Sequence, residues 1–186
     1  MKVLNNGWLT GVRRIPSPNH DARPVGTEID LLVIHNISLP PAEFGGTSIV
    51  QLFTNRLDCN AHPYYAQLIG VTVSSHFLIR RDGQIIQFVS CQKRAWHAGI
   101  STWQNRPRCN DFSLGIELEG TDELPFCDAQ YRALSRLTLR LLRRYPLRHI
   151  AGHSDIAPQR KTDPGACFDW ARYRNSLRKA EHNRQS

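Results

Sequence analysis

The sequence has neither a long hydrophobic run nor an apolar leader. Its longest aliphatic run, residues 31–34, is four residues, whereas a membrane-spanning helix needs about 20. Residues 1–8 lack the apolar stretch of a secretory signal. We therefore expect a cytoplasmic protein with no membrane partner.

Cysteine is sparse, and its spacing is uninformative. The chain has five cysteines, an odd number, and no two of them form a C-x-x-C pair. This pattern argues against a disulfide framework and against a thiolate zinc site. We expect five free thiols, at Cys59, Cys91, Cys109, Cys127 and Cys167.

Acidic residues are fewer than basic ones. The chain has 16 Asp and Glu against 24 Lys and Arg, which gives a formal charge of +8. Nucleic acid is the first partner to consider for a basic chain, and such binding weakens steeply with salt. The basic residues are scattered, however, and no nucleic-acid motif is present. We expect no nucleic-acid partner, and the charge suits either a solvated surface or an anionic small substrate.

The composition fits one globular domain, because 40% of the residues are hydrophobic and 22% are charged. We assign residues 1–186 to a single domain, with a core at about 7–180 and a frayed tail at 181–186. Strands are predicted at 30–36, 75–80, 84–89 and 112–119, and helices start near 47, 62, 128 and 169. Residues 7–24 are predicted to be an irregular arm. The order predicts an α/β fold, α+β-like, with a central mixed β-sheet flanked by helices.

Two of these strands carry informative patterns. Residues 30–36 are apolar at consecutive positions, which indicates a strand buried on both faces, and His35 and Asn36 end it, where α/β sheets place their sites. Residues 112–119 alternate, so Glu117 and Glu119 share a face with Gly115. That face is either a cavity wall or a solvated edge.

A third segment, residues 151–165, is too rich in proline and glycine to be one helix. It contains His153, Lys161 and Asp163. The last two are two positions apart, so in extended backbone both side chains point to one side. Taken alone, the segment also fits an ordinary surface loop.

His35, His153 and Asp163 together form a normal zinc ligand set, with a fourth position left for water. Zinc lowers the pKa of such a water to about 7. A neighbouring carboxylate, Glu117, would transfer the proton, and Lys161 would stabilise an oxyanion. These parts predict a hydrolase for an amide or ester.

Two points qualify this assignment. Glu119, on the same face as Glu117, is the alternative acid, and any one of the eight histidines is more often structural or exposed than a ligand. The remaining histidines divide into three expected at the surface and three pocket candidates, namely His20, His149 and His182, and His62, His76 and His97.

Several blocks of sequence, taken together, resemble a known family. They are V-I-H-N-I-S-L-P-P (33–41), K-R-A-W-H-A-G (93–99), R-C-N-D-F-S (108–113), G-I-E-L-E-G-T-D (115–122) and R-K-T-D-P-G (160–165). In this order they resemble the AmpD-type 1,6-anhydro-N-acetylmuramyl-L-alanine amidases, within the zinc amidases that also include phage amidases and peptidoglycan recognition proteins. The resemblance runs from about residue 7 to residue 173.

The resemblance implies His35, His153 and Asp163 as Zn²⁺ ligands, Glu117 as the catalytic acid/base and Lys161 as the group that polarises the tetrahedral intermediate. It implies cleavage of the amide between 1,6-anhydro-N-acetylmuramic acid and L-alanine in recycled muropeptides, so the partner is a small molecule. In many bacteria this step also lowers the signal that induces a β-lactamase. The alternative is a muropeptide sensor that binds without cutting, as some family members do.

Substrate contacts are predicted at four residues. Asn36 would hydrogen-bond the peptide, Trp96 would offer a face for a sugar ring, His97 would add a polar contact, and Arg108 would pair with a stem-peptide carboxylate. For each a structural role is the alternative, with Trp96 in the core and Arg108 a surface charge. Thr72 stands where close relatives of this type carry an arginine, so the stem-peptide preference is expected to differ while the chemistry is not.

Overall fold

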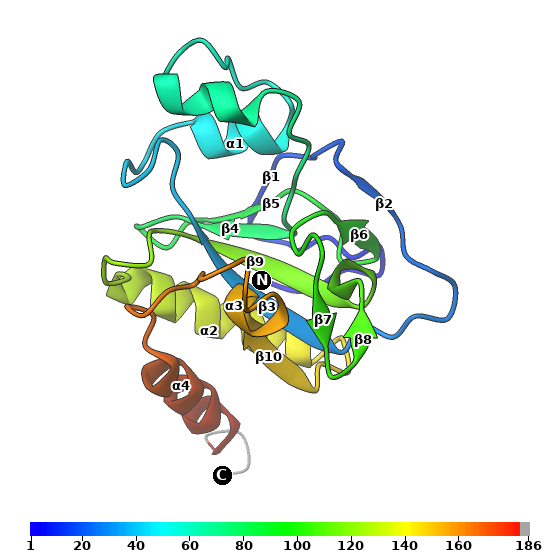
Figure 1. Ribbon diagram of the computed structural model, residues 1–186. Coiled ribbons are helices and arrows are strands. Elements are labelled where there is room, and N and C mark those ends of the chain that lie inside the picture. Colours follow the sequence, from blue (N-terminus) through cyan, green and yellow to red (C-terminus); the bar gives the residue numbers. More distant parts are fainter. Residues whose placement is uncertain (183–186) are drawn as a thin grey trace.

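The computed structural model describes residues 1–182, with side chains through residue 180. Six strands form a central sheet in the order β1-β5-β4-β9-β3-β10 (Figure 1). Their bounds are β1 Arg13–Arg14, β3 Leu31–Ile37, β4 Phe77–Ile79, β5 Ile85–Gln87, β9 Ser113–Glu119 and β10 His149–Gly152. Strands β4 and β5 are antiparallel and the other pairs are parallel. The mixed sheet confirms the predicted fold class, and the strands predicted at 75–80 and 84–89 pair as the antiparallel β4 and β5.

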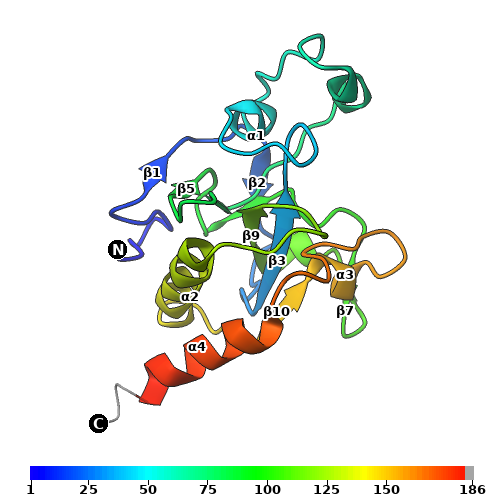
Figure 2. The same ribbon diagram turned by 90° about the vertical axis from the view of Figure 1, so that its left-hand side faces the viewer.

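Helices lie on both sides of this sheet. In Figure 2 the helices α2 and α4 cover one side, and α3 and β7 lie on the other. The helices are α1 Ser48–Phe53, α2 Asp128–Leu142, α3 His153–Ile156 and α4 Trp170–His182, with 3-10 helices η1 Pro63–Leu68 and η2 Cys109–Asp111. Two small antiparallel sheets pair β2 His20–Ala22 with β6 Lys93–Ala95, and β7 Thr102–Trp103 with β8 Arg106–Pro107. No helix among residues 1–182 is long and apolar enough to cross a membrane.

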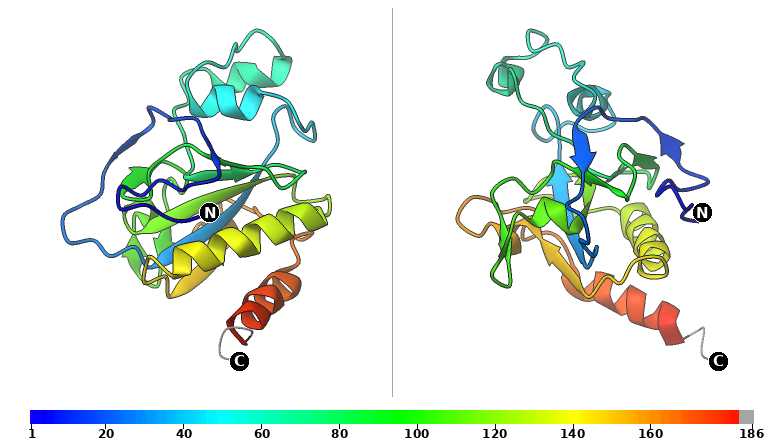
Figure 3. Two further views of the ribbon diagram at one scale, coloured as in Figure 1. Left: turned by 180° about the vertical axis from the view of Figure 1, so that it is seen from behind. Right: turned by 90° about the vertical axis from the view of Figure 1, so that its right-hand side faces the viewer.

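The apolar core lies between the sheet and α2, which runs across the back of the sheet in Figure 3. Leu32, Ile34 and Ile116 project from β3 and β9 into this core. They meet the apolar stripe of α2, which includes Leu134 and Leu137. The apolar side chains that recur every second residue in the strands and every 3.6 residues in the helix thus face the same core layer.

Some boundaries differ from the predicted ones. The arm at 7–24 was predicted to be irregular, but it contains β1 and β2, which pair with β5 and β6. Residues 149–152 form the edge strand β10, which is not among the predicted strands. These short strands lack a local pattern because the pairing partner comes from a distant segment.

The last helix also runs beyond its predicted end, through His182, so residues 181–182 are helical rather than frayed. Residues 183–186 of the predicted tail lie outside the described part. All five cysteines are free thiols, as predicted.

Candidate metal centre and substrate cavity

Three neighbouring strands carry the central residues of the site. His35 on β3 and Glu117 on β9 are paired positions in the parallel ladder. His153 follows directly after β10, which pairs with β3 on its other side. Because these parallel strands run in the same direction, their carboxyl ends meet at one edge of the sheet. The side chains of His35 and Glu117 are only 1% and 8% exposed.

The loop after α3 brings in the third group. The backbone N–H of Ser154 donates to the carbonyl of Asp163 at 2.9 Å, which folds the loop back on the start of α3. The N–H groups of Arg160 and Lys161 both donate to the Ala157 carbonyl at 3.0 Å. Gly152 allows this path, because a Cβ there would lie 2.8 Å from Cδ of Pro164.

Three donor atoms converge at this edge. The Nδ1 atom of His35 lies 3.0 Å from both Nδ1 of His153 and Oδ2 of Asp163, and the last two atoms are 3.2 Å apart. Among the described residues this is the one cluster of three His, Cys, Asp or Glu side chains that suits a metal ion. Two imidazole nitrogens and one carboxylate oxygen are a zinc-type donor set, whereas Mg²⁺ and Ca²⁺ prefer oxygen alone. The residues present therefore fit zinc.

A cavity of about 630 Å³ opens over this cluster, within the range of small-molecule sites. Every predicted site residue except Arg108 lines it, namely His35, Asn36, Trp96, His97, Glu117, His153, Lys161 and Asp163. The Arg108 side chain is 69% exposed and pairs with Asp111 at 3.2 Å. The structure thus gathers eight of these nine residues and leaves Arg108 at the surface.

Three titratable groups at the centre of the cavity, Glu117, Asp163 and His35, have displaced pKa values. Burial, and then the charge of Asp163, raises the pKa of Glu117 well above its ordinary value, while Lys161 opposes the shift. Burial also acts to raise the pKa of Asp163, but hydrogen bonds to His153 and His35 outweigh it and hold that pKa below the usual range. Burial lowers the pKa of His35 to about 4. A neutral His35 imidazole beside an ionised Asp163 carboxylate is the form that binds a metal ion.

The two acids on β9 have different environments. Oε2 of Glu117 is buried and makes no hydrogen bond to any described residue. Glu119 is 1% exposed, and its carboxylate accepts hydrogen bonds from the backbone N–H groups of Gly45 and Arg81 and from the Arg80 guanidinium at 2.8–3.2 Å. Glu119 therefore ties the 43–46 loop and the hairpin to β9, and it does not line the cavity.

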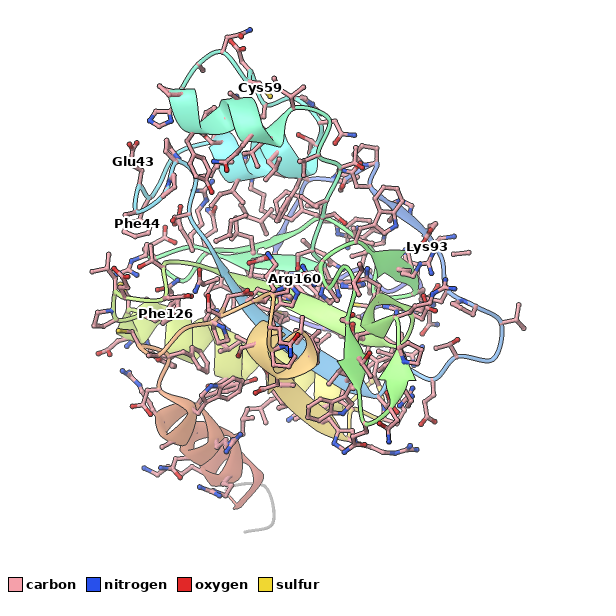
Figure 4. The ribbon with its side chains drawn as sticks, viewed as in Figure 1. Glu43, Phe44, Cys59, Lys93, Phe126 and Arg160 are labelled. Atoms are coloured by element: carbon pink, nitrogen blue, oxygen red, sulfur yellow. The ribbon has the colours of Figure 1, made fainter. Side chains whose placement is uncertain are left out.

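Two residues that the sequence did not single out also belong to the site. Asp122 lines the cavity, and its Oδ1 accepts a hydrogen bond from the Asn36 amide at 2.6 Å. Arg160 projects near the centre of the view in Figure 4, and its Nη2 donates to the carbonyls of Ala98 and Ile100 at 2.7 and 2.8 Å. Both lie in blocks that resemble the family, but no spacing rule predicts these contacts.

Fewer of the other histidines line the cavity than was predicted. Of the pocket candidates only His97 lines the cavity. His76 is fully buried beside β9, and His62 caps η1, where its Nδ1 accepts from the N–H of Tyr64 at 3.1 Å. His20 and His149 are half-buried rather than exposed, and the side chain of His182 lies outside the described residues.

This geometry can be compared with known proteins. Residues 25–166 match the family described as N-acetylmuramoyl-L-alanine amidase. This chain belongs to that family. The 1,6-anhydro-N-acetylmuramyl-L-alanine amidase AmpD of Citrobacter freundii is 56% identical over 182 residues, covering 97% of each chain.

Solved amidase structures agree. The crystal structure of an AmpD derivative has a TM-score of 0.91 at 57% identity, covering 94% of this chain and 98% of that chain. The amidase AmiD from Escherichia coli, solved with the substrate anhydro-N-acetylmuramic acid-L-Ala-D-gamma-Glu-L-Lys, has a TM-score of 0.59 at 32% identity, covering 83% of this chain and 60% of that chain. The amidase fold is therefore shared along nearly the whole chain.

Proposed function

We propose that this amidase-family chain hydrolyses the amide between 1,6-anhydro-N-acetylmuramic acid and L-alanine in muropeptides, with zinc held by His35, His153 and Asp163. The observation that carries the proposal is the convergence of these three donor atoms beside the buried carboxyl of Glu117. The near full-length likeness to AmpD amidases supports the choice of substrate. The proposed setting is cytoplasmic cell-wall recycling.

The bound ion would supply Lewis acidity, which polarises a carbonyl and makes a water more acidic at neutral pH. Glu117 on the cavity wall is then the base that accepts the proton of the attacking water at its unpartnered Oε2. The same carboxyl returns that proton to the departing amine of L-alanine. The raised pKa of Glu117 suits a group that must hold a proton between these steps.

Other residues of the cavity bind and orient the substrate. Lys161 lines the cavity, and its ammonium group would stabilise the negative charge that develops on the scissile carbonyl oxygen. The amide N–H₂ of Asn36 is held by Asp122, so its carbonyl oxygen is left to accept an N–H from the stem peptide. Trp96 also lines the cavity and would offer an apolar face for the sugar. Recognition of the stem-peptide carboxylate by Arg108 would require that side chain to turn from Asp111.

The test is turnover of a purified anhydromuropeptide, with product masses read before and after removal of zinc by a chelator. We expect free stem peptide and anhydro sugar, loss of both on chelation, and recovery when zinc is returned. Asp163→Ala should fail to retain zinc, measured as metal content per chain. Intact muropeptide after incubation with protein of confirmed zinc content would instead support a sensor that binds without cutting.

A further inference from the structure

The far sides of the two histidine rings face one short segment of chain. The Nε2 atom of His35 lies 2.9 Å from Nδ1 of His97. The Nε2 atom of His153 lies 3.1 Å from the carbonyl oxygen of Ala98. Two consecutive residues, remote in sequence from both ligands, therefore meet the nitrogens that do not face the metal cluster.

These contacts determine which ring nitrogen carries the proton. A carbonyl oxygen only accepts, so Nε2 of His153 must be the protonated nitrogen and its Nδ1 keeps the free lone pair. Coordination by Nδ1 of His35 likewise needs a proton on Nε2, which His97 accepts at its Nδ1. His97 then carries its own proton on Nε2, which lies 3.3 Å from Oγ of Ser113. One assignment thus satisfies every member of the chain.

The segment is itself held in place. Oδ1 of Asn110 accepts hydrogen bonds from the backbone N–H groups of both His97 and Ala98, at 3.1 and 2.8 Å. The His97 ring fits against β9 only because residue 115 is glycine, since a Cβ there would lie 2.6 Å from Cγ of His97. Arg160 donates to the same Ala98 carbonyl at 2.7 Å.

From these contacts we infer that His97 and the Ala98 carbonyl fix both zinc-binding imidazoles in the form that coordinates through Nδ1. Asn110 is the positioning residue that holds this segment against the site. The inference rests on the proposed zinc site and adds residues that touch neither the ion nor the reacting amide. Such outer hydrogen bonds orient the ligand rings and raise their basicity.

The experiment measures the zinc dissociation constant by competition with a chromophoric chelator. His97→Phe keeps an aromatic ring but removes the acceptor for His35, and we expect affinity to fall by about 10–100-fold. Asn110→Ala should lower zinc affinity by about 10-fold, at the lower end of the same range, because Asn110 contacts the backbone of His97 and Ala98 and not the ligand rings themselves. Asn110→Asp keeps an oxygen that accepts both N–H groups and should restore most of the affinity. The visible absorption of the Co²⁺-loaded protein should change in His97→Phe and Asn110→Ala only.

Asn19→Ala is the matched control, because Asn19 also holds backbone, donating to the Val73 carbonyl at 2.8 Å, while its side-chain hydrogen bonds go to Val73 and Asn55 and not to the donor residues, His97 or Ala98. It should lower thermal stability without changing zinc affinity. Unchanged zinc affinity in a folded His97→Phe protein would overturn the inference while leaving the proposed function intact. Absence of zinc binding in the unmodified protein would overturn the proposed function first.

A measurement on the unmodified protein tests the inference even if the variants misfold. Nitrogen-15 NMR of the imidazoles in the zinc-loaded protein should show His35 and His153 protonated at Nε2, with Nδ1 bound to metal. A proton on Nδ1 of either ring would overturn the assignment.

Discussion

The two faces of β3 and β9 have the same backbone and opposite chemistry. On one face Ile34 and Ile116 pack under α2 and are fully buried. On the other face, one residue further along each strand, His35 and Glu117 are also buried, but they line the cavity and have displaced pKa values. Burial on the first face stabilises the fold, and burial on the second prepares polar groups for chemistry. Substitutions on the two faces should therefore be separable by experiment.

The largest effect is expected at Glu117. In Glu117→Gln the amide keeps the size of the side chain but cannot transfer a proton, so turnover should fall by about 10²–10⁴-fold. Zinc content and the free energy of unfolding should stay near those of the unmodified protein. Near-full turnover by the folded, zinc-loaded variant would remove Glu117 from the mechanism.

A substitution at Lys161 gives a second test of the cavity side of the sheet. Lys161→Met keeps the apolar stem and removes the charge, and kcat should fall by about 10²–10³-fold through loss of oxyanion stabilisation. Because the stem remains, the fold should be retained. A rise in KM with unchanged kcat would show that Lys161 binds substrate rather than the transition state.

Leu137 on α2 tests the opposite face, since it is fully buried in the core. Leu137→Ala should lower the free energy of unfolding by about 2–5 kcal/mol through lost transfer energy and a residual cavity. Urea denaturation measures this. At temperatures where the variant is folded, zinc affinity and turnover should be preserved, and a loss of either would mean that the faces are coupled.

His76 offers a pH test at a histidine that is not a proposed ligand, although its ring is in edge contact with that of His97. Burial, and then the charge of Arg23, lowers the pKa of His76 well below its ordinary value of 6.5. The unfolded chain therefore binds one more proton below about pH 6.5, and the free energy of unfolding should fall with decreasing pH by up to about 1.4 kcal/mol per unit from this group. His76→Gln should flatten the pH dependence of urea midpoints by that amount. An unchanged slope would show that His76 is not the group responsible.

The smallest effect is expected at Arg108. Its ion pair with Asp111 is exposed, so Arg108→Ala should change stability by less than about 1 kcal/mol. A KM increase for muropeptides that carry a free side-chain carboxylate would support the predicted substrate contact. Equal KM for amidated and unamidated stem peptides in both proteins would contradict it.

Sequence patterns predicted the main strands and helices, because each pattern depends only on residues close together in the chain. The apolar run of β3, the alternation of β9 and the stripe of α2 each follow from the side-chain period of one element. These patterns identified the core face and placed Glu117 on the other face. They left Glu119 open as an alternative acid, because alternation gives the face of a residue and not its neighbours. The two acids are distinguished by the contacts of Glu119 with Arg80 and the 43–46 loop, and by the position of Glu117 on the cavity wall.

The sequence by itself determined the element order, the central strand, the donor types of the metal site and the family. Tertiary structure alone decided that His35, His153 and Asp163 converge within 3.0–3.2 Å. It also decided that Arg108 stays outside the cavity and that His97, Ala98 and Asn110 form a layer behind the ligands. The physical reason is that these contacts join residues up to 128 positions apart, where pairing depends on how strands align rather than on any local period.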